Sequence, residues 1–270
     1  MRLMGIVNTT PDSFYGSSRA TGADGVARGL ALEAEGAHVL DVGGESTRPG
    51  SLPVEADEEI RRVVPVLTGL KQAGCQLPLS IDTRKYLTAR AAVEAGATWL
   101  NDVSALEDDP KLGPFAAEAG LTVVLMHHQG DPATMQKAPH YDDIGTEVRD
   151  YLSRRVEAAL GWGIRAENLY LDPGIGFGKT LGQTLELIAA LPLLATLGFP
   201  LLVGLSRKSF LGKIDEEAGA GPTPVEQRLA SSLAGALAMA EAGVAMLRVH
   251  DVLDTARALR AWTCLKPGGR

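Results

Sequence analysis

Residues 88–102 read TARAAVEAGATWLND, and this stretch contains the unit that recurs along the whole chain. An amphipathic helical segment ends at Gly96, a short apolar run covers 98–100, and the polar pair Asn101-Asp102 follows. A glycine just after a helix favours a left-handed C-cap, which other residues adopt only at a cost in free energy. The stretch therefore predicts a helix followed at once by a buried strand.

The same unit can be found eight times. Apolar runs lie at 3–7, 38–42, 78–81, 98–100, 121–126, 169–171, 200–204 and 245–249. Glycines also precede four of the other runs, at Gly36, Gly74, Gly120 and Gly243. Strict alternation of strands and helices predicts a parallel sheet that is buried on both faces. Because eight units favour a closed barrel, we expect one domain over residues 1–270, an α/β fold of the (β/α)8 TIM-barrel type.

One helix start is predicted in more detail, in the segment TPVEQRLASSLAGALAMAEAG over 223–243. Thr223 is a suitable N-cap, Pro224 suits the first helical position, and Glu226 can complete a capping box. We therefore expect the helix to begin directly after Thr223.

The composition limits the class of function. The 270 residues carry a formal charge of -7, which argues against a broad nucleic-acid surface. Cys75 and Cys264 are far apart and lack a CxxC or Cys/His cluster, as is typical of free thiols in a reducing compartment. No apolar stretch approaches the roughly 20 residues of a membrane helix. We expect a soluble, cytoplasmic protein that binds small molecules but neither nucleic acid nor membranes.

Polar residues follow all eight apolar runs. They include Asn8, Asp41, Asp82, Asn101, His127, Asp172, Ser206 to Ser209, and Arg248 with His250. In a barrel of this type the carboxyl ends of the strands converge on one face, where active sites lie. Buried polar groups cost free energy unless they are paired, and stability alone does not require them at these positions. The pattern therefore predicts a functional site at the carboxyl ends of the strands.

The residue types narrow the chemistry of this site. Its cationic members are Arg48, Lys208, Arg248 and, when protonated, His250. Such residues suit an anion of high charge density such as diphosphate, and the backbone of GGESTRPG (43–50) can add N–H donors. Asp82, Asn101 and Asp172 offer donors and acceptors for a flat nitrogen heterocycle. Because no serine–histidine–acid order, acid pair or cysteine nucleophile stands out, group transfer with a diphosphate leaving group fits better than hydrolysis.

Eight segments together resemble the signature segments of the dihydropteroate synthase family. They are MGIVNTTPDSF, DVGGESTRPG, SIDTRK, WLNDVS, LMHHQGDPATMQ, LDPGIGFGK, LLVGLSRKSFLG and LRVHDV, in that family's order over residues 4 to about 252. The resemblance implies condensation of 6-hydroxymethyl-7,8-dihydropterin diphosphate with p-aminobenzoate, in folate biosynthesis. It also implies an SN1-like path, in which diphosphate leaves with the help of Mg²⁺ and the arylamine attacks a pterin-methyl cation.

The resemblance implies roles for individual residues. Catalysis is expected of Asp82, Lys208 and Arg48, with Asp82 offsetting charge on the cation. The pterin is expected to bind Asp82, Asn101, Met126, Asp172 and Lys208. The diphosphate is expected to bind Asn8, Thr47, Arg248 and His250, with Asn8 also a ligand of Mg²⁺. The p-aminobenzoate pocket, where sulfonamides compete, is expected to contain Phe14, Thr47, Arg48, Pro49, Phe177 and Ser209. The family also implies a homodimer.

Several other interpretations of single motifs are weaker. GIGFGK (174–179) fits neither nucleotide-binding glycine motif, so we expect a tight turn over the pterin. His127 and His128 are adjacent on an extended strand and should point to opposite faces, which disfavours joint metal ligation. Asp41 and Glu45 are expected to support Arg48.

Two other functions stay open at this point. A folate- or corrinoid-linked methyltransferase barrel would share the pterin-binding residues but would not need the diphosphate set. A non-catalytic paralogue would bind pterins or serve as a partner subunit, and the fold alone does not distinguish it from an enzyme. The first loop reads SFYGSS where many family members have SFSDGG, so a contact through the second aspartate of that loop is in doubt.

Overall fold

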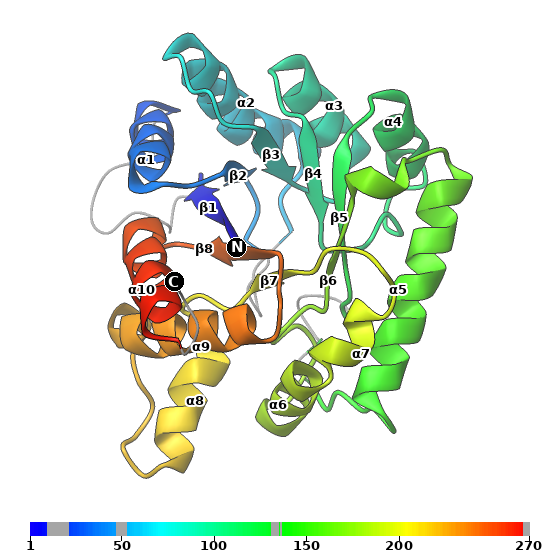
Figure 1. Ribbon diagram of the computed structural model, residues 1–270. Helices are drawn as coiled ribbons and strands as arrows, with labels where there is room; N and C mark the ends of the chain where they lie inside the picture. Colours follow the sequence, from blue (N-terminus) through cyan, green and yellow to red (C-terminus); the bar gives the residue numbers. More distant parts are fainter. Residues whose placement is uncertain (10–21, 47–52, 131–134, 136, 267–270) are drawn as a thin grey trace.

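A barrel of eight parallel strands forms the centre of the protein (Figure 1). The computed structural model describes residues 1–9, 22–46, 53–130, 135 and 137–266. The strands are β1 (Arg2–Asn8), β2 (Val39–Gly43), β3 (Leu79–Asp82), β4 (Trp99–Asp102), β5 (Thr122–Met126), β6 (Leu169–Asp172), β7 (Leu202–Gly204) and β8 (Met246–Val249). Hydrogen-bonded neighbours run in the order β6-β5-β4-β3-β2-β1-β8-β7. An isolated parallel bridge between Leu171 of β6 and Leu201, the residue before β7, closes the barrel and confirms the predicted fold.

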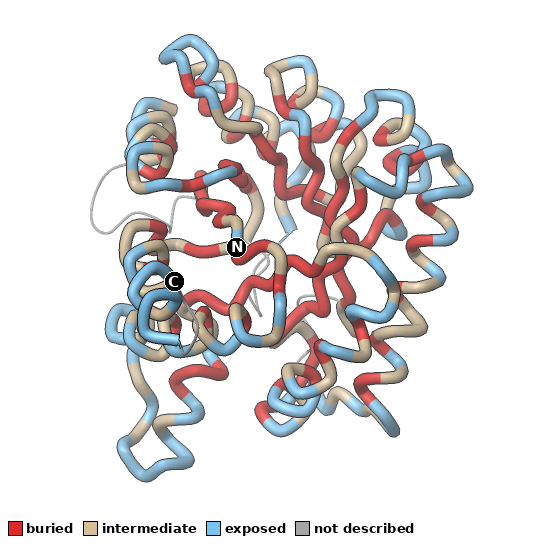
Figure 2. The backbone as a smooth tube through the Cα atoms, in the orientation of Figure 1, coloured by how far each residue is buried: buried red, intermediate tan, exposed pale blue. Residues whose placement is uncertain are grey.

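Helices surround the barrel. They are α1 (Gly22–Glu35), α2 (Ala56–Gln72), α3 (Tyr86–Glu94), α4 (Leu112–Glu118), α5 (Ile144–Gly161), α6 (Leu181–Ala189), α7 (Leu191–Ala195), α8 (Ser209–Glu217), α9 (Leu229–Glu241) and α10 (Val252–Leu265). Figure 2 shows buried residues concentrated on the central strands and exposed residues on the outer sides of the helices. Among the described helices, none has the length and apolar character needed to cross a membrane.

Alternation along the strands divides the buried side chains into two layers. Outward-facing residues pack against the helices and form the larger core. Inward-facing residues at the amino ends of the strands form a second apolar cluster, made of Met4, Val39, Trp99, Val124, Leu202 and Met246. Two positions further along, the inward face becomes polar, as in Trp99 followed by Asn101 and Met246 followed by Arg248. The barrel interior therefore changes from apolar to polar towards the carboxyl ends of its strands.

The glycines predicted to end helices adopt the expected conformation. All five have positive φ, from +64° at Gly120 to +103° at Gly96. At Gly96 the backbone N–H donates to the carbonyl of Val93 in α3, so the chain reverses directly into β4. The placement of these helix ends was thus predictable from the sequence.

The helix predicted to begin directly after Thr223 begins later than expected. Residues Val225–Gln227 form a 3₁₀ turn, and α9 starts only at Leu229. The Thr223 hydroxyl bonds the Asp215 carboxylate, at the end of α8, instead of capping a helix. The Arg228 guanidinium donates to the carbonyl oxygens of Thr223 (2.9 Å) and Arg207 (3.1 Å). These tertiary contacts override the local capping signal.

Candidate active site

Five of the predicted site residues project from strand ends toward the same mouth of the barrel. Asn8, Asp82, Asn101, Asp172 and Arg248 come from β1, β3, β4, β6 and β8. The strand register places Asn8 beside Gly43, Gly43 beside Asp82, and Asp82 beside Asn101. The structure therefore brings these residues together as predicted.

Arg248 lies between two carboxylates inside the mouth. Its Nε donates to Asp41 Oδ2 at 2.6 Å, and its Nη2 donates to Asp82 Oδ2 at 2.7 Å. Asn101 Nδ2 donates to the same oxygen of Asp41 at 3.0 Å. We call Asp41, Asp82 and Arg248 the Arg248 cluster. One guanidinium thus orders two acids, and Asp41 links it to the predicted pterin-binding amide of Asn101.

Burial shifts the charge balance of the Arg248 cluster. Burial raises the pKa of Asp82 to about 7; Arg248 opposes this shift, and the nearby carboxylate of Asp41 adds to it. Burial also acts to lower the pKa of Arg248, but the two carboxylates outweigh it and the pKa rises. The cluster therefore contains a permanent cation and an acid that titrates near neutral pH.

A second group of charges lies at the ends of β6 and β7. Asp172 Oδ1 accepts a hydrogen bond from the Gly174 N–H at 2.7 Å. Lys208 Nζ donates to the Ile175 carbonyl at 2.5 Å and lies 4.4 Å from the centre of the Phe177 ring. Burial raises the pKa of Asp172 and lowers that of Lys208 to about 8. Lys208 precedes α8, so its extended backbone places it at the mouth.

Lys179, which follows the turn after β6, was not among the predicted site residues. Its side chain is buried, and its Nζ is 3.0 Å from His127 Nδ1 and 3.0 Å from the Gly174 carbonyl oxygen. Burial lowers the pKa of Lys179 to about 7. We call Asp172, Lys179 and Lys208 the Asp172 cluster. The available signal was a lysine in the otherwise uncharged turn GIGFGK, next to a strand end.

The remaining predicted residues divide into described and undescribed ones. His250 Nδ1 is 3.1 Å from Ser206 Oγ, and Ser209 is exposed at the start of α8. Met126 is buried and Phe177 half-buried, and both line a small pocket together with Arg84, Val103, Asp108, His128 and Met135. Phe14, Thr47, Arg48 and Pro49 lie outside the described residues, so the p-aminobenzoate pocket is described only in part.

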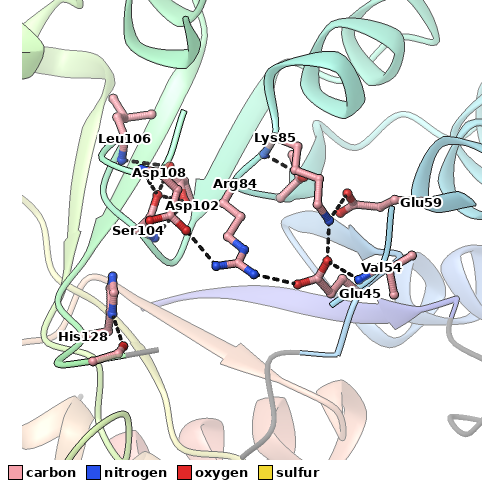
Figure 3. Close-up of polar contacts among 12 residues, drawn as sticks. Glu45, Val54, Glu59, Arg84, Lys85, Asp102, Ser104, Leu106, Asp108 and His128 are labelled. Carbon is pink, nitrogen blue, oxygen red and sulfur yellow. Dashed lines mark hydrogen bonds and ion pairs between the residues drawn. The ribbon is translucent and has the colours of Figure 1, made fainter. Parts of the chain in front are cut away.

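Glu45 belongs to an ion network beside the mouth (Figure 3). It accepts hydrogen bonds from Arg84, from Lys85 and, at 3.1 Å, from the Val54 backbone N–H. Lys85 also donates to the fully buried Glu59 at 2.9 Å. The predicted support of Arg48 by Asp41 and Glu45 involves an undescribed residue, but both acids already have other cationic partners.

The two adjacent histidines have separate environments. His127 is buried against Lys179, whereas the half-buried His128 has its Nδ1 2.9 Å from the Gly130 carbonyl. Burial, followed by the charge of Lys179, lowers the pKa of His127 strongly, so this ring is neutral. Within the described part of the chain, no group of three or more His, Cys, Asp or Glu residues could hold a metal ion.

Comparison with known proteins identifies the family. A family model described as pterin binding enzyme matches residues 4–250. The dihydropteroate synthase of Escherichia coli strain K12 is 42% identical over 259 residues, which cover 96% of this chain and 89% of that protein.

Solved structures give the same result. The Xanthomonas albilineans dihydropteroate synthase with 4-aminobenzoic acid has a TM-score of 0.89 and 47% identity, and covers 98% of this chain and 92% of its own. The same enzyme in complex with 7,8-dihydropteroate has a TM-score of 0.86 and 44% identity, with coverages of 98% and 93%. The chain therefore belongs to the dihydropteroate synthase family of pterin-binding enzymes.

Proposed function

We propose that the protein condenses 6-hydroxymethyl-7,8-dihydropterin diphosphate with p-aminobenzoate to give 7,8-dihydropteroate and pyrophosphate. The observation that carries this proposal is the mouth itself, where buried acids and an amide lie beside a guanidinium and an amine. The related enzyme from Xanthomonas albilineans has been solved with 4-aminobenzoic acid and with 7,8-dihydropteroate. A methyltransferase is not favoured, because the relatives reported above are dihydropteroate synthases.

Recognition of the pterin would rely on the Asp172 side of the mouth. The Asp172 carboxylate, buried and bound to only one backbone N–H among the described residues, has acceptor capacity left for the guanidine-like edge of a pterin. Lys208 can donate to another edge of the ring, and Asn101 supplies an amide from β4. Met126 provides an apolar wall for the pterin, and Phe177, which lines the same pocket, provides one for the ring of p-aminobenzoate.

The diphosphate would bind on the β8–β1 side. Arg248 lies near the end of β8 and His250 directly follows the strand. Both suit a phosphate anion by charge and hydrogen bonding. Mg²⁺ fits this side through the amide oxygen of Asn8, because this ion commonly takes few protein ligands and uses substrate phosphates for the rest. Bound there with Asn8, it would neutralise charge on the leaving diphosphate.

Asp82 would act on the reacting carbon through its charge. When diphosphate leaves, positive charge develops on the pterin methylene, and a fixed carboxylate nearby stabilises it without having to reorganise. Arg248 holds Asp82 by a 2.7 Å hydrogen bond, so the carboxylate is already oriented. The amine of p-aminobenzoate then attacks the methylene, which forms the new C–N bond and releases a proton.

We further propose that the protein acts in the cytoplasm as a homodimer, on the basis of its resemblance to the family. Size-exclusion chromatography with light scattering tests the assembly. Twice the mass of the chain is expected, and the mass of a single chain would contradict this part of the proposal.

The reaction can be tested directly. Purified protein is incubated with Mg²⁺, the pterin diphosphate and p-aminobenzoate, and dihydropteroate and pyrophosphate are quantified by chromatography. We expect equal amounts of both products, dependence on both substrates and suppression by a sulfonamide. Folded protein that binds the pterin diphosphate without forming dihydropteroate would instead indicate a non-catalytic pterin-binding protein.

A further inference from the structure

Lys179 is a buried cation outside the set of residues proposed to touch substrate. Its side chain is only 4% exposed, and no described carboxylate lies within ion-pair distance of its ammonium group. Its three N–H donors instead match three acceptors, the His127 ring nitrogen and the carbonyl oxygens of Gly174 (3.0 Å) and Phe177 (2.9 Å). Burying an ammonium is costly, so this arrangement needs an explanation beyond simple packing.

We infer that Lys179 is a positioning residue that fixes the turn 173–178 and, through this turn, orients Asp172, Phe177 and Lys208 for the reaction. This inference rests on the proposed function, because it concerns how the substrate-binding groups of that reaction are held in place.

Lys179 clamps both ends of the turn. The Phe177 N–H donates to the Gly174 carbonyl at 3.0 Å, and the ammonium group binds that same carbonyl and the one of Phe177. Gly174 has φ +67°, and a Cβ at this position would lie 1.8 Å from the His127 carbonyl oxygen. The turn therefore packs directly on the end of β5 and has no room to shift inward.

The clamped residues make the contacts that reach the site. Gly174 donates to Asp172 Oδ1 at 2.7 Å, and Ile175 accepts from Lys208 Nζ at 2.5 Å. The centre of the Phe177 ring lies 4.4 Å from the ammonium group of Lys208. All three contacts come from residues 174–177, so a change in the turn would alter the predicted pterin-binding pair and the apolar wall together.

His127 anchors the clamp to the barrel. Its ring packs edge-on against Tyr151 with centroids 4.9 Å apart, and its backbone N–H donates to the Asp172 carbonyl at 2.9 Å. The neutral ring accepts from Lys179, so the ammonium group connects β5 to the turn that follows β6. Removing the ammonium group would leave three buried acceptors without this donor.

The test compares Lys179→Met with Leu194→Ala. Methionine keeps an unbranched chain but lacks the donors, whereas Leu194 is a fully buried residue of α7 in the outer core and serves as a control for lost stability. For Lys179→Met we expect kcat/KM to fall about 10²-fold, the scale of a displacement of about 1 Å in a site, with higher KM values for both the pterin diphosphate and p-aminobenzoate. Leu194→Ala should lower the melting temperature and leave both KM values unchanged.

Two further measurements separate positioning from a purely structural role. In a Phe177→Ala background, Lys179→Met should raise the KM for p-aminobenzoate by a smaller factor than in the wild type, because the wall that it positions is already lost. If Lys179→Met does not fold, His127→Gln replaces it and should raise the same KM by a smaller factor, since two of the three acceptors remain.

The outcomes are distinguishable. An inactive wild type would overturn the proposed function. An active wild type, together with Lys179→Met or His127→Gln variants that have normal KM and kcat, would overturn only the inference on Lys179. The inference on Lys179 would also be overturned if Lys179→Met raised the KM for p-aminobenzoate by the same factor in the wild type and in the Phe177→Ala variant.

Discussion

The two charge clusters at the mouth of the barrel are opposite in composition. The Arg248 cluster contains one cation and two acids, Asp41 and Asp82. The Asp172 cluster contains one acid and two amines, those of Lys179 and Lys208, both of which act electrostatically on Asp172. Each cluster lies at the carboxyl ends of parallel strands. With all groups ionised, the Arg248 cluster has one negative charge in excess and the Asp172 cluster has one positive charge in excess.

This difference shows how burial creates titratable groups near neutral pH. Burial disfavours the charged form of any group, so it raises the pKa of Asp82 and of Asp172 and lowers the pKa values of the two amines. The pKa of Asp82 is raised to about 7, and the pKa values of Lys179 and Lys208 are lowered to about 7 and about 8. Acid and amine thus approach the same pH range from opposite directions.

The largest expected effect comes from removing the central cation of the Arg248 cluster. Arg248→Met should lower the free energy of unfolding by about 3 kcal/mol, because two buried carboxylates lose their partner. Urea denaturation measures this loss. Adding Asp82→Asn to the variant should recover part of the stability, since one of the unpaired charges is then absent. If Arg248→Met lowered the free energy of unfolding by less than about 1 kcal/mol, as for an exposed ion pair, the cluster would not be a buried one as described.

The next effect concerns turnover and not stability. Asp82→Asn keeps the shape of the side chain but removes its charge, so the developing pterin-methyl cation loses its electrostatic partner. We expect kcat to fall about 10²-fold or more, as on losing one preorganised electrostatic group. Steady-state kinetics with circular dichroism as a folding control provides the check. Near-normal turnover by the folded variant would remove Asp82 from the mechanism.

The two clusters should give opposite pH dependences of stability. Folded protein binds a proton at Asp82 more tightly than unfolded protein does, so the free energy of unfolding should fall from pH about 4 to about 7. Folded protein releases the proton of Lys208 more readily, so the free energy of unfolding should rise from pH about 8 to about 10.5. Each slope is at most about 1.4 kcal/mol per pH unit for one group.

Variants separate these slopes, as urea denaturation at a series of pH values would show. Asp82→Asn should reduce the acidic slope, although Asp102, whose pKa burial raises to about 6, and Asp172, whose pKa burial also raises, still contribute to it. Lys208→Met should reduce the basic slope, while Lys179 still contributes. If either substitution changed the slope in the other pH range instead, the assignment of opposite surplus charges would be wrong.

The smallest effect is expected at the rim. Asp108 pairs with Arg84 at 2.7 Å, but 38% of its side chain is exposed. Asp108→Asn should therefore change the free energy of unfolding by less than about 1 kcal/mol, as for exposed ion pairs. Urea denaturation of this variant is the matched comparison for Arg248→Met. A loss as large as that of Arg248→Met would show that burial does not separate the two sites.

The sequence predicted the barrel and the placement of most site residues for physical reasons. Glycine C-caps such as Gly96 and the alternation of strand and helix patterns mark local boundaries directly. The inward polar residues Asn101 and Arg248 follow from strand alternation once the barrel is assumed.

Pairing across the barrel was not predictable in the same way. Asp41 and Arg248 are 207 positions apart in the chain, and nothing local indicates their 2.6 Å contact. The contact of Lys179 with His127, 52 positions away, is also non-local. The predicted start of α9 was wrong because the hydroxyl and the carbonyl oxygen of Thr223, which would have capped the helix, bind Asp215 and Arg228 instead.

The most direct test of this account is a calorimetric titration with two ligands, 6-hydroxymethyl-7,8-dihydropterin and its diphosphate. Both are titrated into the wild type, Arg248→Lys and Lys208→Met. If Arg248 holds the diphosphate while Asp172 and Lys208 hold the ring, Arg248→Lys should weaken binding of the diphosphate more than binding of the dihydropterin, because Arg248 also orders Asp82 and Asp41. Lys208→Met should weaken both ligands. Equal weakening of both ligands by Arg248→Lys, or unchanged binding of the dihydropterin to Lys208→Met, would contradict this division of the site.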